Sequence, residues 1–281
     1  MSSAAFNPPQ HVYEPHRVGL PPLGPYVREL WRRRQFAYEM SRTDLRAIHY
    51  NTVFGQLWLL LNPLLLAGVY FVLVDILRGG TRGAEFFAHL MAGLFAYYFV
   101  SDAVRKSVRS VTSGGRLILN TAFPRALLPL SSVVTAVKRF LPTILVYIPV
   151  HIIAGLPVGL HLLWVIPLAG LLTIMAAGLT MLVAAAQVYF RDLKNILPYA
   201  LRVWLYASPV LYYADEVPDR YDFLLAVNPL GGLLTAWSDV LNLGQAPDAS
   251  ALALACAWAL ALFVAGAAFF VSREREFAVR L

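Results

Sequence analysis

Charged residues are scarce in this 281-residue sequence. Only 14% of the residues are charged and 59% are hydrophobic, whereas an ordinary soluble domain carries about 25% charged residues. The mean hydropathy of +0.61 agrees with this balance. The shortage of charge excludes an ordinary water-soluble fold.

Cysteine and lysine are also rare. The one cysteine, Cys256, lies inside an apolar stretch, so one chain has neither a disulfide nor a cysteine metal site. None of Lys106, Lys138 and Lys194 follows a glycine-rich phosphate loop, so we expect no nucleotide hydrolysis by this chain. The six histidines show no i, i+4 pairing, so no metal site and no bound cofactor are predicted.

Six long apolar stretches stand out against these absences. Each covers most or all of a hydrocarbon core about 30 Å thick, which needs about 20 helical residues. Backbone polar groups in lipid need internal partners, and these runs do not alternate as barrel strands do. The predicted fold class is therefore all-α and polytopic, with transmembrane helices over residues 53–77, 86–104, 127–154, 162–190, 196–213 and 251–271.

Arginine and lysine are concentrated in every second connection. The segment before the first stretch, the connections 105–125 and 191–194, and the last residues hold most of them. The positive-inside rule then predicts a plasma-membrane protein with both termini in the cytoplasm. The net charge of +7 follows from this topology and from contact with anionic membrane lipids, so nucleic-acid binding is not expected.

The residues before the first stretch form two predicted segments. Residues 1–25 contain six prolines and no apolar core, which predicts a flexible cytoplasmic tail before a transmembrane domain of residues 26–281. Residues 26–50 lack proline and glycine and carry an apolar stripe that includes Trp31 and Tyr38 and is interrupted by Arg34. This pattern predicts an amphipathic helix in the membrane interface, which could be a plain anchor or a docking element.

Two connections are too patterned to be passive loops. Between residues 105 and 124, a short helix would expose Leu117, Ile118 and Phe123 beside Arg116 and Asn120, which would suit a groove on a soluble subunit. Residues 215–248 hold an acidic stretch followed by an apolar run that is too short to span. That run predicts re-entrant or surface-lying helices on the outer side, before the last span.

Two basic residues, Lys138 and Arg139, fall inside the third stretch. Charge at membrane depth is costly and marks functional sites by default. These side chains could face a cavity and attract an anionic headgroup, pair with Asp102, or reach back to the membrane surface.

Aromatic residues are abundant along the predicted spans. Their rings can stack on the apolar faces of sugars, although membrane-interface belts use the same residues. As a set, they could line part of a glycan path. The candidates are Trp58, Tyr70, Tyr97, Tyr98, Trp204, Tyr206 and Tyr212.

Several short motifs follow one another in order along the chain. They are Leu45-Arg46, Thr52-Val53-Phe54-Gly55-Gln56-Leu57-Trp58, Asn62-Pro63, Phe123-Pro124-Arg125, Leu128-Pro129-Leu130, Tyr189-Phe190-Arg191-Asp192-Leu193, Ser208-Pro209-Val210 and Asn228-Pro229. Together they resemble the permease subunits of ABC-2 type polysaccharide exporters, the group that handles O-antigen, teichoic acid and galactan. The proline-rich start is most similar to actinobacterial galactan exporters.

The resemblance implies a homodimer that works with two separate ATPase subunits, which would bind ATP and Mg. It implies that these subunits act on the interfacial helix near Trp31 and on residues 116–123. It also implies a lateral opening and a central channel for a polyprenyl-pyrophosphate-linked glycan. Lys138 and Arg139 depart from the family pattern in the third span and suggest a pyrophosphate to hold.

Other classes of protein stay open at this point. An ion-coupled secondary carrier should show related repeats and broken helices meeting at the midplane, and no convincing repeat is present. An intramembrane enzyme acting on lipid-linked sugars should show clustered carboxylates. The only candidates for such a cluster are Asp215, Glu216, Asp219 and Asp222.

Overall fold

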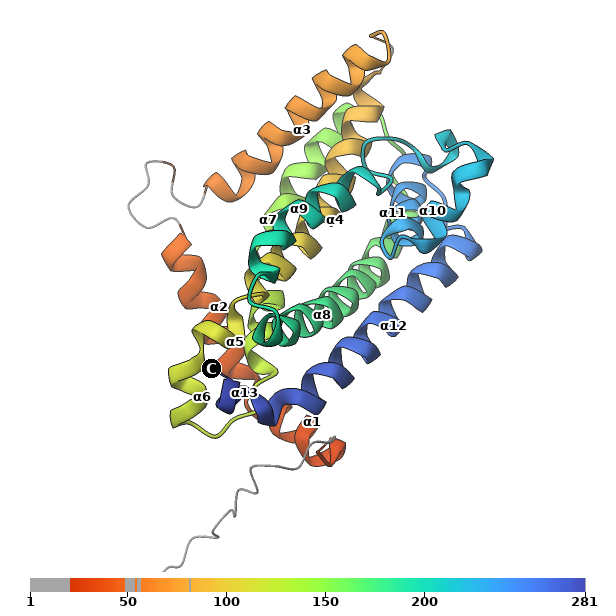
Figure 1. Cartoon of the computed structure of the whole chain (residues 1–281). Helices are drawn as coiled ribbons and strands as arrows, with labels where there is room; N and C mark the ends of the chain where they lie inside the picture. Colours follow the sequence, from red (N-terminus) through yellow and green to blue (C-terminus); the bar gives the residue numbers. More distant parts are fainter. Residues whose placement is uncertain (1–20, 49–53, 55–56, 81, 281) are drawn as a thin grey trace, which may run out of the picture.

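The computed structural model describes residues 21–48, 54, 57–80 and 82–280, and within these residues every regular element is helical (Figure 1). The α-helices are α1 (Leu23–Arg32), α2 (Arg34–Ile48), α3 (Trp58–Leu77), α4 (Ala84–Ser107), α5 (Ser110–Ser113), α6 (Gly115–Asn120), α7 (Leu127–Ile153), α8 (Val165–Tyr189), α9 (Leu193–Tyr206), α10 (Asp222–Val227), α11 (Gly231–Ser238), α12 (Ala249–Arg273) and α13 (Phe277–Arg280). The proposed tail of residues 1–25 lies mostly outside the described residues.

Four helical segments in the described part of the chain are long and apolar enough to cross a membrane. They are Ala84–Ser107, Leu127–Ile153, Leu160–Tyr189 and Ala249–Arg280. A fifth is obtained if Asp219–Val227 and Gly231–Leu243, which are bent by 106° at a short break, count as one span. The all-α, polytopic class is thus confirmed.

The fifth predicted span is shorter than expected, because α9 has only 14 residues. In the first predicted span α3 has 20 residues, and residues 53, 55 and 56 of that span lie outside the described part of the chain. Helix α9 ends early because Ser208 and Pro209 follow it, and proline offers no backbone N–H to continue a helix. Six spans therefore stay a prediction.

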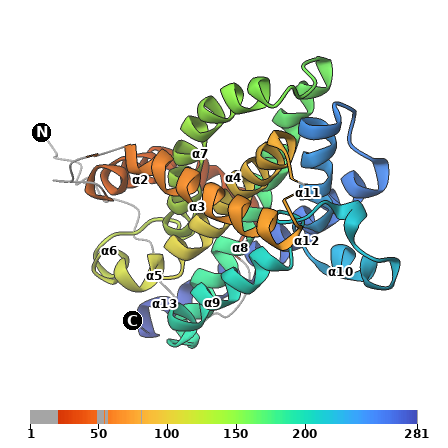
Figure 2. The same cartoon turned by 90° about the horizontal axis from the view of Figure 1, so that it is seen from above.

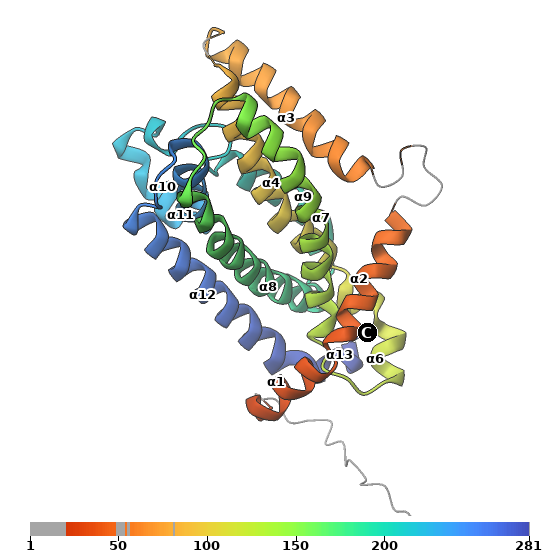
Figure 3. The ribbon, with the colours of Figure 1, turned by 180° about the vertical axis from the view of Figure 1, so that it is seen from behind.

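Helix α4 lies at the centre of the bundle, in contact with α3, α7, α8, α9 and α11 (Figure 2). Most of its side chains between Phe86 and Val104 are buried. Helix α3 joins α4 at one end and diverges from the bundle toward its own start (Figures 1 and 3). This divergence leaves space between α3 and the pair α4 and α7.

Helices α8 and α12 make the closest helix pair. A Cβ atom added to Gly266 would overlap the backbone carbonyl of Gly178, and one added to Gly178 would overlap the backbone at Leu262 and Phe263. Small residues let membrane helices approach to backbone contact, which is how such helices gain packing energy in lipid.

The chain segments divide between two ends of the bundle. One end, here called the terminal end, holds α1, α6 and α13 (Figures 1 and 3). The other, the opposite end, holds the connection between α3 and α4, residues 211–221 and α10. The arginine-rich segments thus lie together at the terminal end, and the acidic residues 215–222 lie at the opposite end.

Candidate functional site

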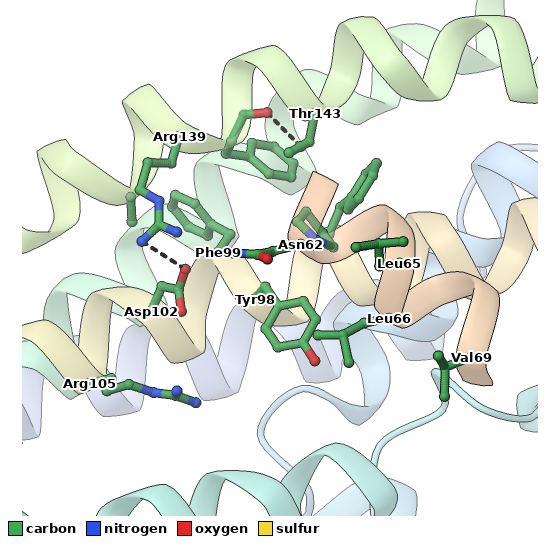
Figure 4. Close-up of a pocket in the computed structure, with 14 residues that line it drawn as sticks. Asn62, Leu65, Leu66, Val69, Tyr98, Phe99, Asp102, Arg105, Arg139 and Thr143 are labelled. Atoms are coloured by element: carbon green, nitrogen blue, oxygen red, sulfur yellow. Dashed lines mark hydrogen bonds and ion pairs between the residues drawn. The ribbon is translucent and has the colours of Figure 1, made fainter. Parts of the chain in front are cut away.

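A cleft of about 540 Å³ lies between α3, α4 and α7 (Figure 4). Its walls are mostly apolar, and Leu65 and Val69 of α3 are exposed along it. The remaining lining residues are Asn62, Pro63, Leu66, Phe95, Tyr98, Phe99, Asp102, Arg105, Ala136, Arg139, Phe140 and Thr143. The cleft exists because α3 stands away from its neighbours near its start.

The charged residues of the cleft gather at the side nearer the terminal end. Asp102 and Arg105 come from the last turns of α4, and Arg139 reaches across from α7. The Arg139 guanidinium forms an ion pair with the Asp102 carboxylate at 3.1 Å (Figure 4). Both side chains keep about a third of their surface exposed. The cleft therefore has one polar, positively charged side and otherwise apolar walls.

Lys138 is not part of this cleft. Its ammonium lies 3.4 Å from the centre of the Tyr38 ring and donates a hydrogen bond of 3.2 Å to the Tyr38 carbonyl. Adjacent helical residues point about 100° apart, so Lys138 faces α2 while Arg139 faces the cleft. Lys138 and Arg139 are adjacent in the sequence, but their side chains lie in different environments.

The candidate aromatic residues fall into two groups. Tyr98 lines the cleft, and Tyr70 of α3 meets Tyr206 of α9 edge to face at 6.5 Å. Tyr97 instead is buried and donates a hydrogen bond to the Leu201 carbonyl. The structure thus leaves the first group accessible and uses Tyr97 to pack α4 against α9.

Trp204 also serves packing. Its indole N–H donates a 2.7 Å hydrogen bond to the side-chain oxygen of Asn228, and its ring lies 5.9 Å from that of Tyr97. Tyr212, beyond the end of α9, donates to the Ala207 carbonyl at 3.1 Å. Trp58 packs on Phe54 at the start of α3, before the cleft lining begins.

The predicted interfacial helix is present as two helices, α1 and α2, that join at Arg33. Trp31 and Tyr38 are more than half exposed, and Arg34 lies over the Trp31 ring at 4.7 Å. The side of α2 that packs on the protein centres on Ala37, which is buried. An apolar face therefore remains available for lipid or a partner.

The loop helix α6 is also present, but its exposed face differs from the expected one. Ile118 is buried, and Phe123 packs on Phe36 of α2 at 5.2 Å. The prediction that Ile118 is exposed is therefore wrong, and Phe123 is half-buried. A six-residue helix lying on the bundle must turn one apolar side inward, and Ile118 occupies that side. The exposed residues are Arg116, Leu119 and Asn120, with Leu117 half-buried.

A polar cluster joins three distant segments at the terminal end. Glu274, after α12, accepts hydrogen bonds from the Tyr26 hydroxyl and the Arg125 backbone N–H, both at 2.6 Å. Burial, together with the negative charge of Glu274, raises the pKa of Tyr26 far above its ordinary value, so Tyr26 stays a donor. No local pattern in the sequence indicates the contact of Tyr26 with Glu274, because the two residues are 248 positions apart.

We expect Glu274→Gln to lower the free energy of unfolding by about 1–3 kcal/mol, the value of hydrogen bonds to a charged group. A glutamine keeps one acceptor but places an NH₂ donor against the donors of Tyr26 or Arg125. Thermal unfolding of the purified protein in one detergent measures this loss. Glu39→Gln is the matched control, since Glu39 is exposed and forms an ion pair of 3.8 Å with the exposed Arg42. Equal effects of the two substitutions would contradict the role of Glu274.

At the opposite end, Glu216 connects the segment after α9 to the connection between α3 and α4. It forms ion pairs with Arg82 and with Arg78, the latter at 3.4 Å. Burial would raise the pKa of Glu216, but the hydrogen bond from Arg82 and the charges of both arginines bring it below its ordinary value. One carboxylate of the acidic stretch is thereby committed to ion pairs, which weakens the case for a catalytic cluster.

Four apolar helical segments of spanning length, two of which line a cleft with one charged side, define the chain as a multi-pass membrane protein. No protein-family model matches it. The chain is, however, similar to O-antigen export system permease proteins named RfbA. The protein from Myxococcus xanthus is 29% identical over 259 residues, which cover 90% of this chain and 97% of that protein.

Two proteins of the same name from Klebsiella pneumoniae are 28% and 27% identical over 206 residues, which cover 73% of this chain and 79% of each relative. These similarities confirm the resemblance to polysaccharide-exporter permeases that the motifs indicated. The relatives are named as permeases, in agreement with the expectation that the chain is a transport subunit.

Proposed function

We propose that this chain is the membrane permease subunit of an ATP-driven exporter that moves a lipid-linked polysaccharide out of the cytoplasm. The observation that carries this proposal is the similarity to an O-antigen export permease over 90% of the chain. The sequence has no phosphate-binding loop of its own. ATP and Mg would therefore be bound by a separate ATPase subunit.

The terminal end is the cytoplasmic end in this proposal. The arginine-rich segments lie there, as the positive-inside rule requires, and both the interfacial helices and α6 are within reach of a soluble partner. Two copies of the chain would assemble with two ATPase subunits. The helices bent by 106° would then lie at the outer side, before the last span, as re-entrant elements.

The glycan path is proposed along the accessible aromatic residues between α3, α4 and α9. Tyr70, Tyr98 and Tyr206 offer ring faces for sugar stacking and hydroxyls for hydrogen bonds. Trp58 and Tyr212 lie toward the two ends of such a path. Many weak stacking contacts suit a moving polymer, because one tight contact would stop it. A galactan-type glycan on a polyprenyl pyrophosphate is the specific cargo proposed.

The surface of α6 offers a direct test of ATPase docking. Leu119 is 63% exposed and lies between Arg116 and Asn120, so Leu119→Asp changes the exposed face without touching the core. We expect about a tenfold loss of the ATPase stimulation by the permease, as for removal of one interface anchor. Phe123→Asp is less suitable, because Phe123 packs on Phe36.

The measurement is ATP hydrolysis by the co-purified complex in nanodiscs, with and without lipid-linked glycan. Leu160→Asp is the control, since Leu160 is 85% exposed and lies before α8, away from α6. Unchanged stimulation by Leu119→Asp would remove α6 from the docking surface. Uphill export by this chain alone, driven by an ion gradient, would favour the secondary-carrier alternative over the exporter.

A further inference from the structure

We propose that the cleft between α3, α4 and α7 binds the acidic phosphate head of a lipid, and that Asp102 is the internal counter-ion which this phosphate displaces from Arg139. The cleft would be the binding site for the headgroup of the proposed lipid-linked cargo. The inference rests on the proposed exporter function only for the side of the membrane from which the lipid arrives. The binding itself is a property of the isolated chain.

The shape of the cleft fits an amphiphile. Asp102, Arg105 and Arg139 lie on one side, and the rest of the wall is formed largely by leucine, valine and phenylalanine side chains (Figure 4). Leu65 and Val69, on the α3 side, are more than half exposed. The other polar lining residues are Asn62, Tyr98 and Thr143, which carry no charge. A phosphate with a hydrocarbon chain would match both parts of the wall.

The charges of the cleft favour an anion. Two guanidinium groups face one carboxylate, which leaves one positive charge without an internal counter-charge among the lining residues. Guanidinium groups bind phosphate through two parallel N–H···O bonds, a geometry that an ammonium cannot offer. Both Asp102 and Arg139 keep about a third of their surface exposed, so a ligand can reach them.

Asp102 explains how such a site can release its ligand. The carboxylate of Asp102 forms an ion pair with Arg139 at 3.1 Å and so supplies the counter-charge of this guanidinium within the cleft. An arriving phosphate exchanges for this carboxylate, so part of its binding energy is offset by the broken ion pair. The affinity stays moderate, as transport requires, because a headgroup held too tightly would not leave.

Lys138 provides an internal control that the sequence alone could not identify. It is the neighbour of Arg139 and carries the same charge, yet its ammonium lies over the Tyr38 ring, outside the cleft. A general attraction of anionic lipid to basic side chains would depend on both residues. Binding in the cleft would depend on Arg139 but not on Lys138.

The test measures binding of farnesyl pyrophosphate to the purified chain in zwitterionic phosphatidylcholine nanodiscs, by native mass spectrometry. We expect Arg139→Gln to weaken binding about tenfold, as for loss of one charge-assisted pair. Lys138→Gln should change binding by less than about twofold, since it lies outside the site. Asp102→Asn should tighten binding, because it removes the competing carboxylate.

A folding defect is separated from a binding defect by the double variant Asp102→Asn with Arg139→Gln. It removes both charges and leaves no unpaired carboxylate, so its thermal unfolding should match that of the unmodified protein while its binding stays weak. Equal weakening by Lys138→Gln and Arg139→Gln would overturn the site. So would unchanged binding in the double variant.

Competing ligands assign the source of the phosphate. Displacement of farnesyl pyrophosphate by an equal amount of phosphatidylglycerol would support the site and mark it as one for bilayer phospholipid. Resistance to phosphatidylglycerol would support it as a site for the pyrophosphate of the cargo. Displacement of farnesyl pyrophosphate by inorganic pyrophosphate at the same concentration would contradict the proposal that the site binds a lipid, because it would show that no hydrocarbon chain is needed. No ATPase is present, so failure of the exporter proposal would leave these outcomes unchanged.

Discussion

Gly266→Val should push α12 away from α8 and lower both the melting temperature and the amount of folded protein. A Cβ atom at residue 266 would overlap the carbonyl of Gly178, and a backbone atom cannot rotate aside as a side chain can. Overpacking of a close contact costs about 1–3 kcal/mol, and more where the backbone must shift. In lipid the loss is not recovered by burying apolar surface elsewhere, since separated helices meet equally apolar chains.

Gly170→Val, on the neighbouring helix α8, is the control for this experiment. No heavy atom lies within 4 Å of a Cβ built at Gly170, so it introduces the same side chain without the overlap. Fluorescence-detected size exclusion after a series of heating steps compares the two variants. Equal melting temperatures for the two would show that α8 and α12 do not pack at Gly266 as described.

Asn228→Leu should be the most damaging single change outside the helix interfaces. Asn228 is 7% exposed and stands where the chain turns from α10 into α11. Its side-chain oxygen accepts hydrogen bonds from the Trp204 indole and the Leu230 backbone N–H, at 2.7 and 3.0 Å. Its amide group donates to the Ala207 carbonyl and the Ser208 hydroxyl, both at 3.0 Å.

A leucine at this position has the same number of side-chain heavy atoms but leaves the Trp204 indole N–H and the Leu230 backbone N–H without their acceptor, while the Ala207 carbonyl keeps the Tyr212 hydroxyl. Each unsatisfied group costs about 1–3 kcal/mol, so a loss of about 2–6 kcal/mol is expected for the two donors. Asn228→Asp should lose less, because it keeps the acceptor for Trp204. Asn120→Leu, on the exposed side of α6, should change stability little. A melting temperature of Asn228→Leu within a degree of the unmodified protein would contradict the proposed network.

Much of the fold follows from the length of the apolar runs alone. The runs that became α4, α7, α8 and α12 have about 20 or more mostly apolar residues, which leaves a helix across lipid as the simplest outcome. The run that became α9 contains Ser208 and Pro209, and its helix ends before them. The composition of the sequence locates this apolar run, but it does not predict the residue at which helix α9 ends.

The site was harder to predict, because it depends on the rotation of helices about their axes. From the sequence, Arg139 could either face a cavity or pair with Asp102. In the structure it does both. The sequence could not separate Lys138 from Arg139, since helical phase is ambiguous in an apolar run with basic residues side by side. For the same reason, the inward turn of Ile118 was missed.

Contacts between segments that are distant in the sequence could not be predicted, because they have no local sequence pattern. Nothing near Tyr26 or Glu274 indicates that the two meet, and neither the ion pair of Arg82 with Glu216 nor the hydrogen bonds of Asn228 have a local signature. Single-sequence reasoning can identify which residues are polar in an apolar setting. The choice among their partners comes from the packing of the whole bundle.

Among the described residues, α3 joins α4 at its end and diverges from the bundle toward its start (Figures 1 and 3). Its end near Leu77 is pinned, because Asp75 accepts a 3.0 Å hydrogen bond from the Arg82 backbone and Arg82 is itself bound to Glu216. With 20 residues, α3 is about 30 Å long. A rotation of a few degrees about the pinned end would thus displace Trp58 far more than Leu77, and would widen the cleft mainly beside its charged residues.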